Sequence, residues 1–320
     1  MDSKKFVIRL ITFIFMFTCI TTYAASYLYD SRDVKYDNST SGIVSTNVQD
    51  AIDELYTCAS YYTFIKNLTT DNANFHNSIF RGKDVTDYYD DGTLWTRISS
   101  GEFTDLYVGD YIYKNNIYWR IAGFDTNLGR GNSTDTSVNQ TYNRHHTVIV
   151  PDGRLTAAQM NSSNTTTGGY VGSQMYTTIL PSVLTTYIEP VFGNHILQYR
   201  NLLTPGMTST LYNRYGTNTG ASSGGEWYTR QLDLMNENQV YGSIVWSSSG
   251  FETGMDNIQF PLFALRPEYV IARDNSGNRQ DYWLRNVVSS SYFARINDRG
   301  HIYSNNATNS NGVRPYFYID

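Results

Sequence analysis

Cysteine and lysine are the residues that this chain has little of. Its 320 residues include two cysteines, Cys19 and Cys58, and Cys19 lies in an N-terminal apolar run. Without that run, Cys58 would be alone and could form no internal disulfide, so stability has to come from a buried core. The roughly 300 remaining residues, rich in aromatic side chains, are enough to build one. Lysine is absent after Lys114, and the arginines that replace it favour planar hydrogen bonding.

Patterns of catalytic and metal-binding residues are missing as well. His145 and His146 are adjacent, so a strand would turn them to opposite faces, and no third ligand stands at a suitable spacing. The glycine-rich stretch 168–173 lacks the lysine of a phosphate loop, and no G-x-S-x-G string is present. We therefore expect no catalytic residue, no metal and no cofactor, and we interpret the chain as a binding protein rather than an enzyme.

The N-terminus has the layout of a secretory signal peptide. Lys4, Lys5 and Arg9 precede an apolar run at 10–20, and small residues follow at 22–24. The run is shorter than the roughly 20 residues of a membrane span, although an uncleaved N-terminal anchor remains an alternative. Residues 1–24 are thus predicted to be a signal peptide, and the protein to be secreted or held on the cell surface.

The charge of the chain argues against some partners. Removing residues 1–24 takes away three basic residues and one acidic residue, which changes the formal charge from −5 to −7. An acidic exported chain lacks the excess of basic residues that attracts nucleic acid or anionic lipid. We therefore expect no nucleic-acid partner.

A short helix is predicted in residues 25–60, after a polar linker. Asn47 is a suitable N-cap, and Val48, Ala51, Ile52 and Leu55 form an apolar stripe at helical spacing. Such a short helix needs a packing partner, which is either its own domain or other copies of the chain in a homo-oligomeric stalk through residues 47–57. The string TNVQDAIDELY looks like a segment that precedes C-terminal heads in phage fibres and bacterial surface proteins.

The rest of the chain is predicted to be an irregular linker at 61–100 and an α+β head at 101–320. A hairpin is expected around Lys114-Asn115-Asn116, because these residues tolerate positive φ. Further strands are expected at 147–150, 240–246, 260–265, 282–285 and 312–320, and helices at 155–160, 173–192 and 227–236.

The segment 286–311 carries the candidate binding residues. Phe293, Ala294 and Ile296, with Ile302 across a turn, are expected to face inward. Strand alternation then turns most of the polar residues to another face, and their mixture of aromatic area and adaptable hydrogen-bonding groups is typical of binding surfaces. A solvated edge is the plainer alternative. The predicted ligand-binding residues are Tyr292, Arg295, Asn297, Asp298, Arg299, His301, Tyr303, Asn305, Asn306 and Asn309.

Nine strings between 109 and 315 give the chain a resemblance to a known family. They are GDYI at 109–112, WRIAGF at 119–124, AQMNSS at 158–163, GYVGS at 169–173, LMNE at 234–237 with VYG at 240–242, FPLFAL at 260–265, YWLR at 282–285 and GVRP at 312–315. In this order they resemble the C-type-lectin-like domain in target proteins of diversity-generating retroelements from gut bacteria and their phages. That domain is related to the formylglycine-generating-enzyme superfamily.

The resemblance implies a C-type-lectin-like fold whose segment 286–311 is rewritten by adenine-directed mutagenesis. Such mutagenesis turns asparagine codons into many others but not into Lys, Glu, Gln, Met or Trp codons, and residues 286–311 contain none of these five. The paired cysteines of formylglycine formation and the Glu-Pro-Asn string of calcium-dependent lectins are absent; Glu189-Pro190 is followed by Val191.

The interpretation is an exported, diversified binding protein that recognises a protein or glycan ligand on another cell or phage. The first alternative is the receptor-binding tip of a phage or prophage, oligomerised through residues 47–57. The second is an enzyme of the formylglycine-enzyme superfamily, for which the sequence offers no catalytic residues.

Overall fold

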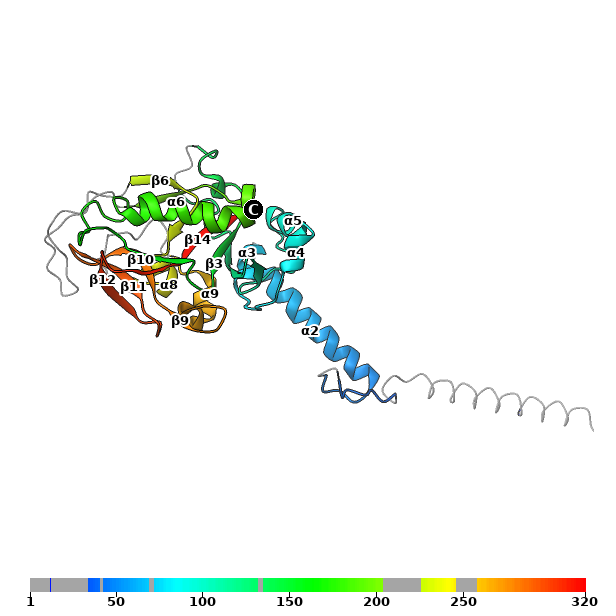
Figure 1. Ribbon diagram of the computed structural model, residues 1–320. Coiled ribbons are helices and arrows are strands. Elements are labelled where there is room, and N and C mark those ends of the chain that lie inside the picture. The colour runs from blue at the N-terminus through cyan, green and yellow to red at the C-terminus, as the bar shows by residue number, and fades with distance from the viewer. Residues whose placement is uncertain are drawn as a thin grey trace, which may run out of the picture. The chain divides into compact units, whose positions relative to one another are not determined.

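The computed structural model describes residues 34–40, 43–68, 72–131, 135–203, 226–245 and 258–320, together with Thr12. The chain divides into two compact units, residues 1–70 and residues 71–320 (Figure 1). The expected signal peptide at 1–24 and the start of the linker after it lie outside the described residues, apart from Thr12. Within the described ranges, no helix has the length and the apolar composition that a membrane span requires.

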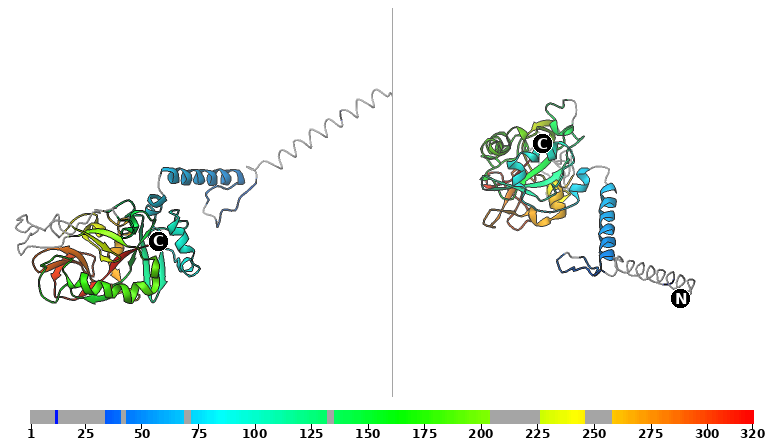
Figure 2. Two further views of the ribbon diagram at one scale, coloured as in Figure 1. Left: turned by 90° about the horizontal axis from the view of Figure 1, so that it is seen from above. Right: turned by 90° about the vertical axis from the view of Figure 1, so that its right-hand side faces the viewer.

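The first unit contains a longer helix than the sequence predicts. Helix α2 runs over Val48–Leu68 and appears as one uninterrupted helix in Figure 2. Asn47 is its N-cap, as predicted, because its side-chain oxygen accepts the backbone N–H of Asp50 at 2.9 Å. Ala51 is buried, but Ile52 and Leu55 are 52% and 55% exposed in the single chain. The apolar stripe is therefore largely uncovered within the described residues.

The second unit is a mixed α+β structure. One five-stranded sheet has the order β1-β2-β3-β14-β7, and the other has the order β12-β11-β10-β13-β4. The first sheet consists of β1 (Tyr111–Lys114), β2 (Ile117–Phe124), β3 (Thr147–Pro151), β14 (Pro315–Ile319) and β7 (Asp233–Leu234). The second consists of β12 (Ile302–Asn306), β11 (Tyr292–Ile296), β10 (Tyr282–Val287), β13 (Asn311–Val313) and β4 (Thr156–Ala158). The α+β class predicted from sequence is confirmed.

Local sequence signals account for two elements of this unit. The β1–β2 hairpin turns at Asn115 and Asn116, with φ of 52° and 62°, which matches a two-residue turn of the type that asparagine favours. The helix expected at 173–192 is present as η2 (Met175–Ile179), α6 (Leu180–Val183), η3 (Leu184–Ile188) and α7 (Glu189–Phe192). It ends where Gly193 takes a positive φ of 50°. Phe192 then packs edge-on against Phe317 and Trp119 of the first sheet.

Several other sequence-based expectations are wrong. Residues 72–99, expected to be irregular, form α3 (Asn72–Asn77), α4 (Thr86–Asp90) and α5 (Thr93–Ser99), which bury Phe75, Leu94 and Ile98. The helix expected at 155–160 is the strand β4. The helix expected at 227–236 is replaced by two strands of different sheets, β6 (Glu226–Arg230) and β7. The strands expected at 240–246 and 260–265 give way to the helices α8 (Glu237–Tyr241) and α9 (Pro261–Leu265). These elements are seven residues long or shorter, so tertiary packing rather than periodicity decides their state.

The chain passes from one sheet to the other through a single residue, Arg314, between β13 and β14. Arg314 is fully buried, and its guanidinium donates to the carbonyl oxygens of Pro151 at 2.8 Å and Tyr269 at 3.0 Å. Gly312 has no room for a side chain, because an added Cβ would overlap the carbonyl oxygen of Asp281. The string GVRP is thus the joint between the two sheets.

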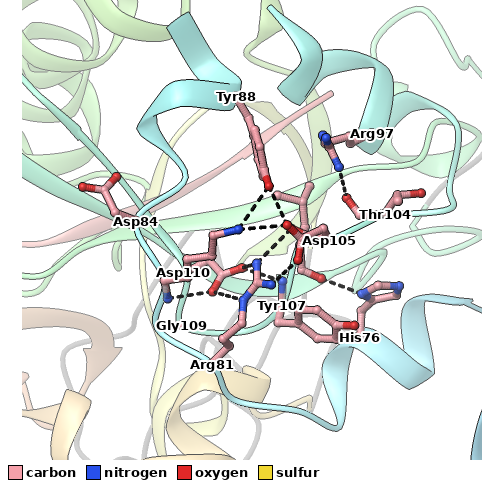
Figure 3. A network of polar contacts seen from close by, with 12 residues as sticks. His76, Arg81, Asp84, Tyr88, Arg97, Thr104, Asp105, Tyr107, Gly109 and Asp110 are labelled. Carbon is pink, nitrogen blue, oxygen red and sulfur yellow. Dashed lines mark hydrogen bonds and ion pairs between the residues drawn. The ribbon is translucent and has the colours of Figure 1, made fainter. Parts of the chain in front are cut away.

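An ionic network ties α4, the loop before it and the loop after α5 to the start of β1 (Figure 3). The fully buried carboxylate of Asp110 accepts two hydrogen bonds from Arg81, at 2.6 and 3.1 Å. It also accepts the backbone N–H groups of Lys83 at 2.9 Å and Tyr107 at 2.8 Å. Four donors therefore converge on one buried charge, which is the condition under which such a charge is tolerated.

Asp105 completes this network at its more exposed side. Arg81, Lys83 and Tyr88 all contact its carboxylate. Burial alone would raise the pKa of Asp105, but the hydrogen bonds from Tyr88, Lys83 and Arg81 outweigh burial and hold that pKa well below its usual range. The carboxylate is therefore charged throughout the neutral range.

Candidate functional site

The β11–β12 hairpin brings the C-terminal polar residues together on the second sheet. Arg295 of β11 lies directly opposite Tyr303 of β12, and Trp283 of β10 lies opposite Arg295 on the other side. In the turn between β11 and β12, the side-chain oxygen of Asn297 accepts the backbone N–H groups of Arg299 and His301, both at 2.9 Å. Residues opposite one another share a face, so Arg295 and Tyr303 point to the same side of the sheet.

That side holds a hollow of about 530 Å³, which we call the C-terminal hollow. It is lined by Arg154, Arg279, Gln280, Asp281, Arg295, Asn297, Asp298, Arg299, His301 and Tyr303. Six of the ten residues predicted from sequence line it: Arg295, Asn297, Asp298, Arg299, His301 and Tyr303.

Two predicted residues lie on the wrong face. Tyr292 pairs with Asn306, and strand alternation turns both away from the face that carries Arg295 and Tyr303. Both have even numbers, whereas the two strand residues of the hairpin that line the hollow, Arg295 and Tyr303, have odd numbers. Tyr292 is still exposed, but it belongs to the opposite surface of the hairpin.

Asn305 and Asn309 sit at the edge of the predicted face. Asn305 points to the same side as Tyr303, and its side chain donates to Asn311 at 3.2 Å and accepts from Asn309. Neither residue lines the hollow. This asparagine cluster fixes the backbone between β12 and β13.

Arg295 is less exposed than a surface anchor would be. Its side chain is 24% exposed, and its guanidinium donates to Asp281 at 2.8 Å and to Asn311 at 3.0 Å. Its Nε is buried and has no hydrogen-bond partner among the described residues. Arg295 therefore holds the floor of the hollow in place as well as lining it.

The inward face predicted for the hairpin is present in part. Phe293, Ala294 and Ile296 are buried, and Ile302 is partly buried. Phe293 and Ala294 are neighbours in one strand and point to opposite sides, so both sides of β11 are covered at this end. Residues 161–166 lie beside this end of the hairpin: Asn161 donates its N–H to the carbonyl oxygen of Ala307, and Thr166 donates its N–H to that of Ser290.

Four lining residues were missed in the sequence. Arg154 precedes β4, Arg279 and Gln280 form β9 (Arg279–Gln280), and Asp281 joins β9 to β10. Gln280 accepts the backbone N–H of Arg154 at 2.9 Å, which joins these segments, although they are far apart in the chain. One signal was available: Asp281 precedes Trp283 by two positions and so points to the same side of the strand.

The charges of the hollow are unbalanced. Arg154 and Arg295 both face Asp281, at 3.5 Å and 2.8 Å. Among the described residues, no carboxylate lies within ion-pair distance of Arg279 or Arg299. The charges of Arg154, Arg295 and Asp281 are therefore paired with one another, whereas the guanidinium groups of Arg279 and Arg299 face solvent.

The two adjacent histidines take part in hydrogen bonds within the fold. His145 Nδ1 lies 2.6 Å from a carboxylate oxygen of Asp125. His146 is fully buried: its Nδ1 lies 2.8 Å from the carbonyl oxygen of Arg144, and its Nε2 accepts the N–H of Asn127 at 3.1 Å. Burial lowers the pKa of His146, and the two hydrogen bonds fit a neutral ring. No cluster of three or more His, Cys, Asp or Glu side chains that could hold a metal occurs in the described part of the chain.

Comparison with known proteins adds no relative. No family model, no curated protein and no solved structure matches this chain.

Proposed function

We propose that this protein is an exported binding protein whose C-terminal hollow recognises a ligand on another cell or phage. The observation that carries the proposal is the gathering of six polar or aromatic side chains from one hairpin around a single hollow. Rigid aromatic area beside adaptable hydrogen-bonding groups is what recognition surfaces use.

The difference between the buried residues that flank the segment 286–311 and the exposed hairpin within it supports a C-type-lectin-like, diversified domain. Trp283, Leu284 and Val313 bracket the segment 286–311 and are fully buried, as expected for a scaffold that holds a changeable segment. Trp283 also donates its indole N–H to the carbonyl oxygen of Ala158 at 2.9 Å, which links β10 to β4. Residues of the turn between β11 and β12 contribute to the hollow without entering this core.

A second candidate function is the receptor-binding tip of a phage or prophage. The observation that favours it is the exposure of Ile52 and Leu55 on α2, because an uncovered apolar stripe on a helix is suited to self-association. Both functions place the ligand at the C-terminal hollow, and they differ in where the protein is displayed.

Binding assays on two matched variants test the proposal. The fluorescently labelled full chain is applied to a glycan array and to a panel of intact gut-bacterial cells. Arg299→Ala/Tyr303→Ala should abolish the binding that the unmodified chain shows, because both side chains are exposed at the hollow. Tyr292→Ala removes a similar side chain from the opposite face and should leave binding unchanged.

A thermal melt on the same proteins separates loss of contact from loss of fold. Exposed side chains change stability by about 0.5 kcal/mol or less, so all three proteins should melt together. Binding that survives in the double variant would contradict the proposal. The diversification itself is tested in the flanking DNA, where a reverse transcriptase and a near-copy of the last coding stretch, differing mainly at adenines, are expected.

A further inference from the structure

The C-terminal hollow has a polar and basic lining. Four of its ten lining residues are arginines and two are aspartates, so the lining carries a formal charge of +2 with His301 neutral. Asp281 is shared by Arg154 and Arg295, which leaves Arg279 and Arg299 without a carboxylate partner among the described residues. Within the part of the chain that the structure describes, these two groups therefore have no counter-charge.

A guanidinium group that faces a hollow favours oxyanions. Arginine forms paired, charge-assisted hydrogen bonds with carboxylate and with similar oxyanions, and these bonds are stronger than neutral ones. The chain as a whole is acidic, with a formal charge of −5, so the basic lining is a local feature and not a reflection of composition.

The remaining lining residues favour a sugar over a protein surface. None of the ten is aliphatic, and Tyr303 is the single large aromatic side chain among them. Centres of protein interfaces are instead depleted of charge and enriched in apolar and aromatic anchors. The side-chain N–H₂ groups of Gln280 and Asn297 donate no hydrogen bond among the described residues, so both are available to hydroxyl groups.

We infer that the C-terminal hollow binds an acidic glycan, with Arg279 and Arg299 holding its carboxylate or sulfate group. The inference rests on the proposed function, because it names the ligand class of the same site. Arg279 lies outside the segment 286–311, whereas Arg299 lies inside it. If that segment is rewritten, Arg279 persists in every variant, so recognition of an acidic group is the constant part of binding and the hairpin selects the rest of the sugar.

The test uses matched pairs of acidic and neutral oligosaccharides with the full chain. The pairs are 3′-sialyllactose with lactose, a hyaluronan tetrasaccharide with its carboxyl-reduced form, and a chondroitin sulfate tetrasaccharide with its desulfated form. In at least one pair, the acidic member should bind about tenfold more tightly or better, because a charge-assisted pair contributes at least that much.

Arg279→Gln should remove this preference, and Arg273→Gln is its matched control. Arg273 lies opposite Arg279 in the β8–β9 pair, with β8 at Ala272–Arg273, but it does not line the C-terminal hollow. The two variants have the same net charge, so a long-range electrostatic effect would weaken binding equally in both. The expected result is a loss of about tenfold in Arg279→Gln alone.

The possible failures of the inference and of the proposed function can be told apart. Equal affinity for both members of every pair, or unchanged affinity in Arg279→Gln, would overturn the acidic glycan. So would cell binding that is lost after protease treatment but not after glycosidase treatment, since it would identify a protein ligand at the same hollow. In each of these cases the proposed function stands if Arg299→Ala/Tyr303→Ala still abolishes cell binding.

Discussion

The buried carboxylate of Asp110 gives the sharpest test of what stabilises the second unit. Asp110→Asn keeps the shape of the side chain but removes its charge and turns one acceptor oxygen into a donor group. Each oxygen of Asp110 accepts one bond from Arg81 and one from a backbone N–H, so two of the four hydrogen bonds are lost. The new N–H₂ group would then face donors, and Arg81 would lose its most buried partner.

The expected cost is about 3–5 kcal/mol, the range for breaking a buried ion pair by removing one member. For a unit of this size, each kcal/mol lowers Tm by about 2–4 °C, so the fall should be roughly 6–20 °C. Calorimetry or circular dichroism on the full chain measures it, with chemical denaturation as a second estimate of the free energy of unfolding.

Asp105→Asn is the matched control, because it makes the same change in the same network. The Asp105 side chain is 39% exposed, so its ion pairs are screened and the expected cost is about 0–1 kcal/mol. Its φ of 52° also suits asparagine, which tolerates the left-handed region well. Equal effects of the two substitutions would refute the view that burial makes the Asp110 carboxylate the essential member of the network.

Three further predictions concern the core, the pH dependence and the first unit. Trp283→Ala should cost about 3–5 kcal/mol, because the indole is fully buried; a melt within 2 °C or so of the unmodified chain would contradict this. His146 has a lowered pKa, so between pH 7 and 5 the unfolded chain binds a proton that the folded chain does not. As the pH decreases from 7 to 5, the free energy of unfolding should therefore decrease by up to about 1.4 kcal/mol per pH unit. His146→Gln should flatten that slope in urea titrations. Finally, Ile52→Glu/Leu55→Glu should convert an oligomer into a monomer by light scattering, and a monomeric unmodified chain would show that the stripe of α2 has no partner copy.

Local chemistry explains which parts of the fold could be predicted. The β1–β2 turn was predictable because Asn115 and Asn116 tolerate positive φ without help from distant residues. α8 was not: Asn236 and Gln239 cap it reciprocally, but the helix is only five residues long and its apolar Val240 fits a strand equally well. Similarly, Pro261 begins α9 in a run of apolar residues that has no helical period.

The part of the candidate site that could be predicted is the part that follows from strand alternation. Arg295 and Tyr303 belong to one hairpin, so the alternation of side chains along its strands is enough to place both at the hollow. Tyr292 was misplaced because its chemistry, and not its position in the strand, suggested a binding role. Arg154 and Arg279 could not be found, since their segments meet through a hydrogen bond between distant parts of the chain, from the backbone N–H of Arg154 to Gln280.

The anchoring of the segment 286–311 has a consequence for its length. Tyr282 of β10 lies opposite Gly312 of β13 in a parallel pair, so the chain leaves and re-enters the same sheet on neighbouring strands. Because the two ends are held together by the sheet, lengthening the turn at 297–301 adds only the slow logarithmic cost of a longer closed loop, about 0.6 kcal/mol for each doubling. Inserted peptides at the tip of this hairpin should therefore cost little stability, provided that they leave the hydrogen bond from Tyr241 to the carbonyl oxygen of Gly300 in place.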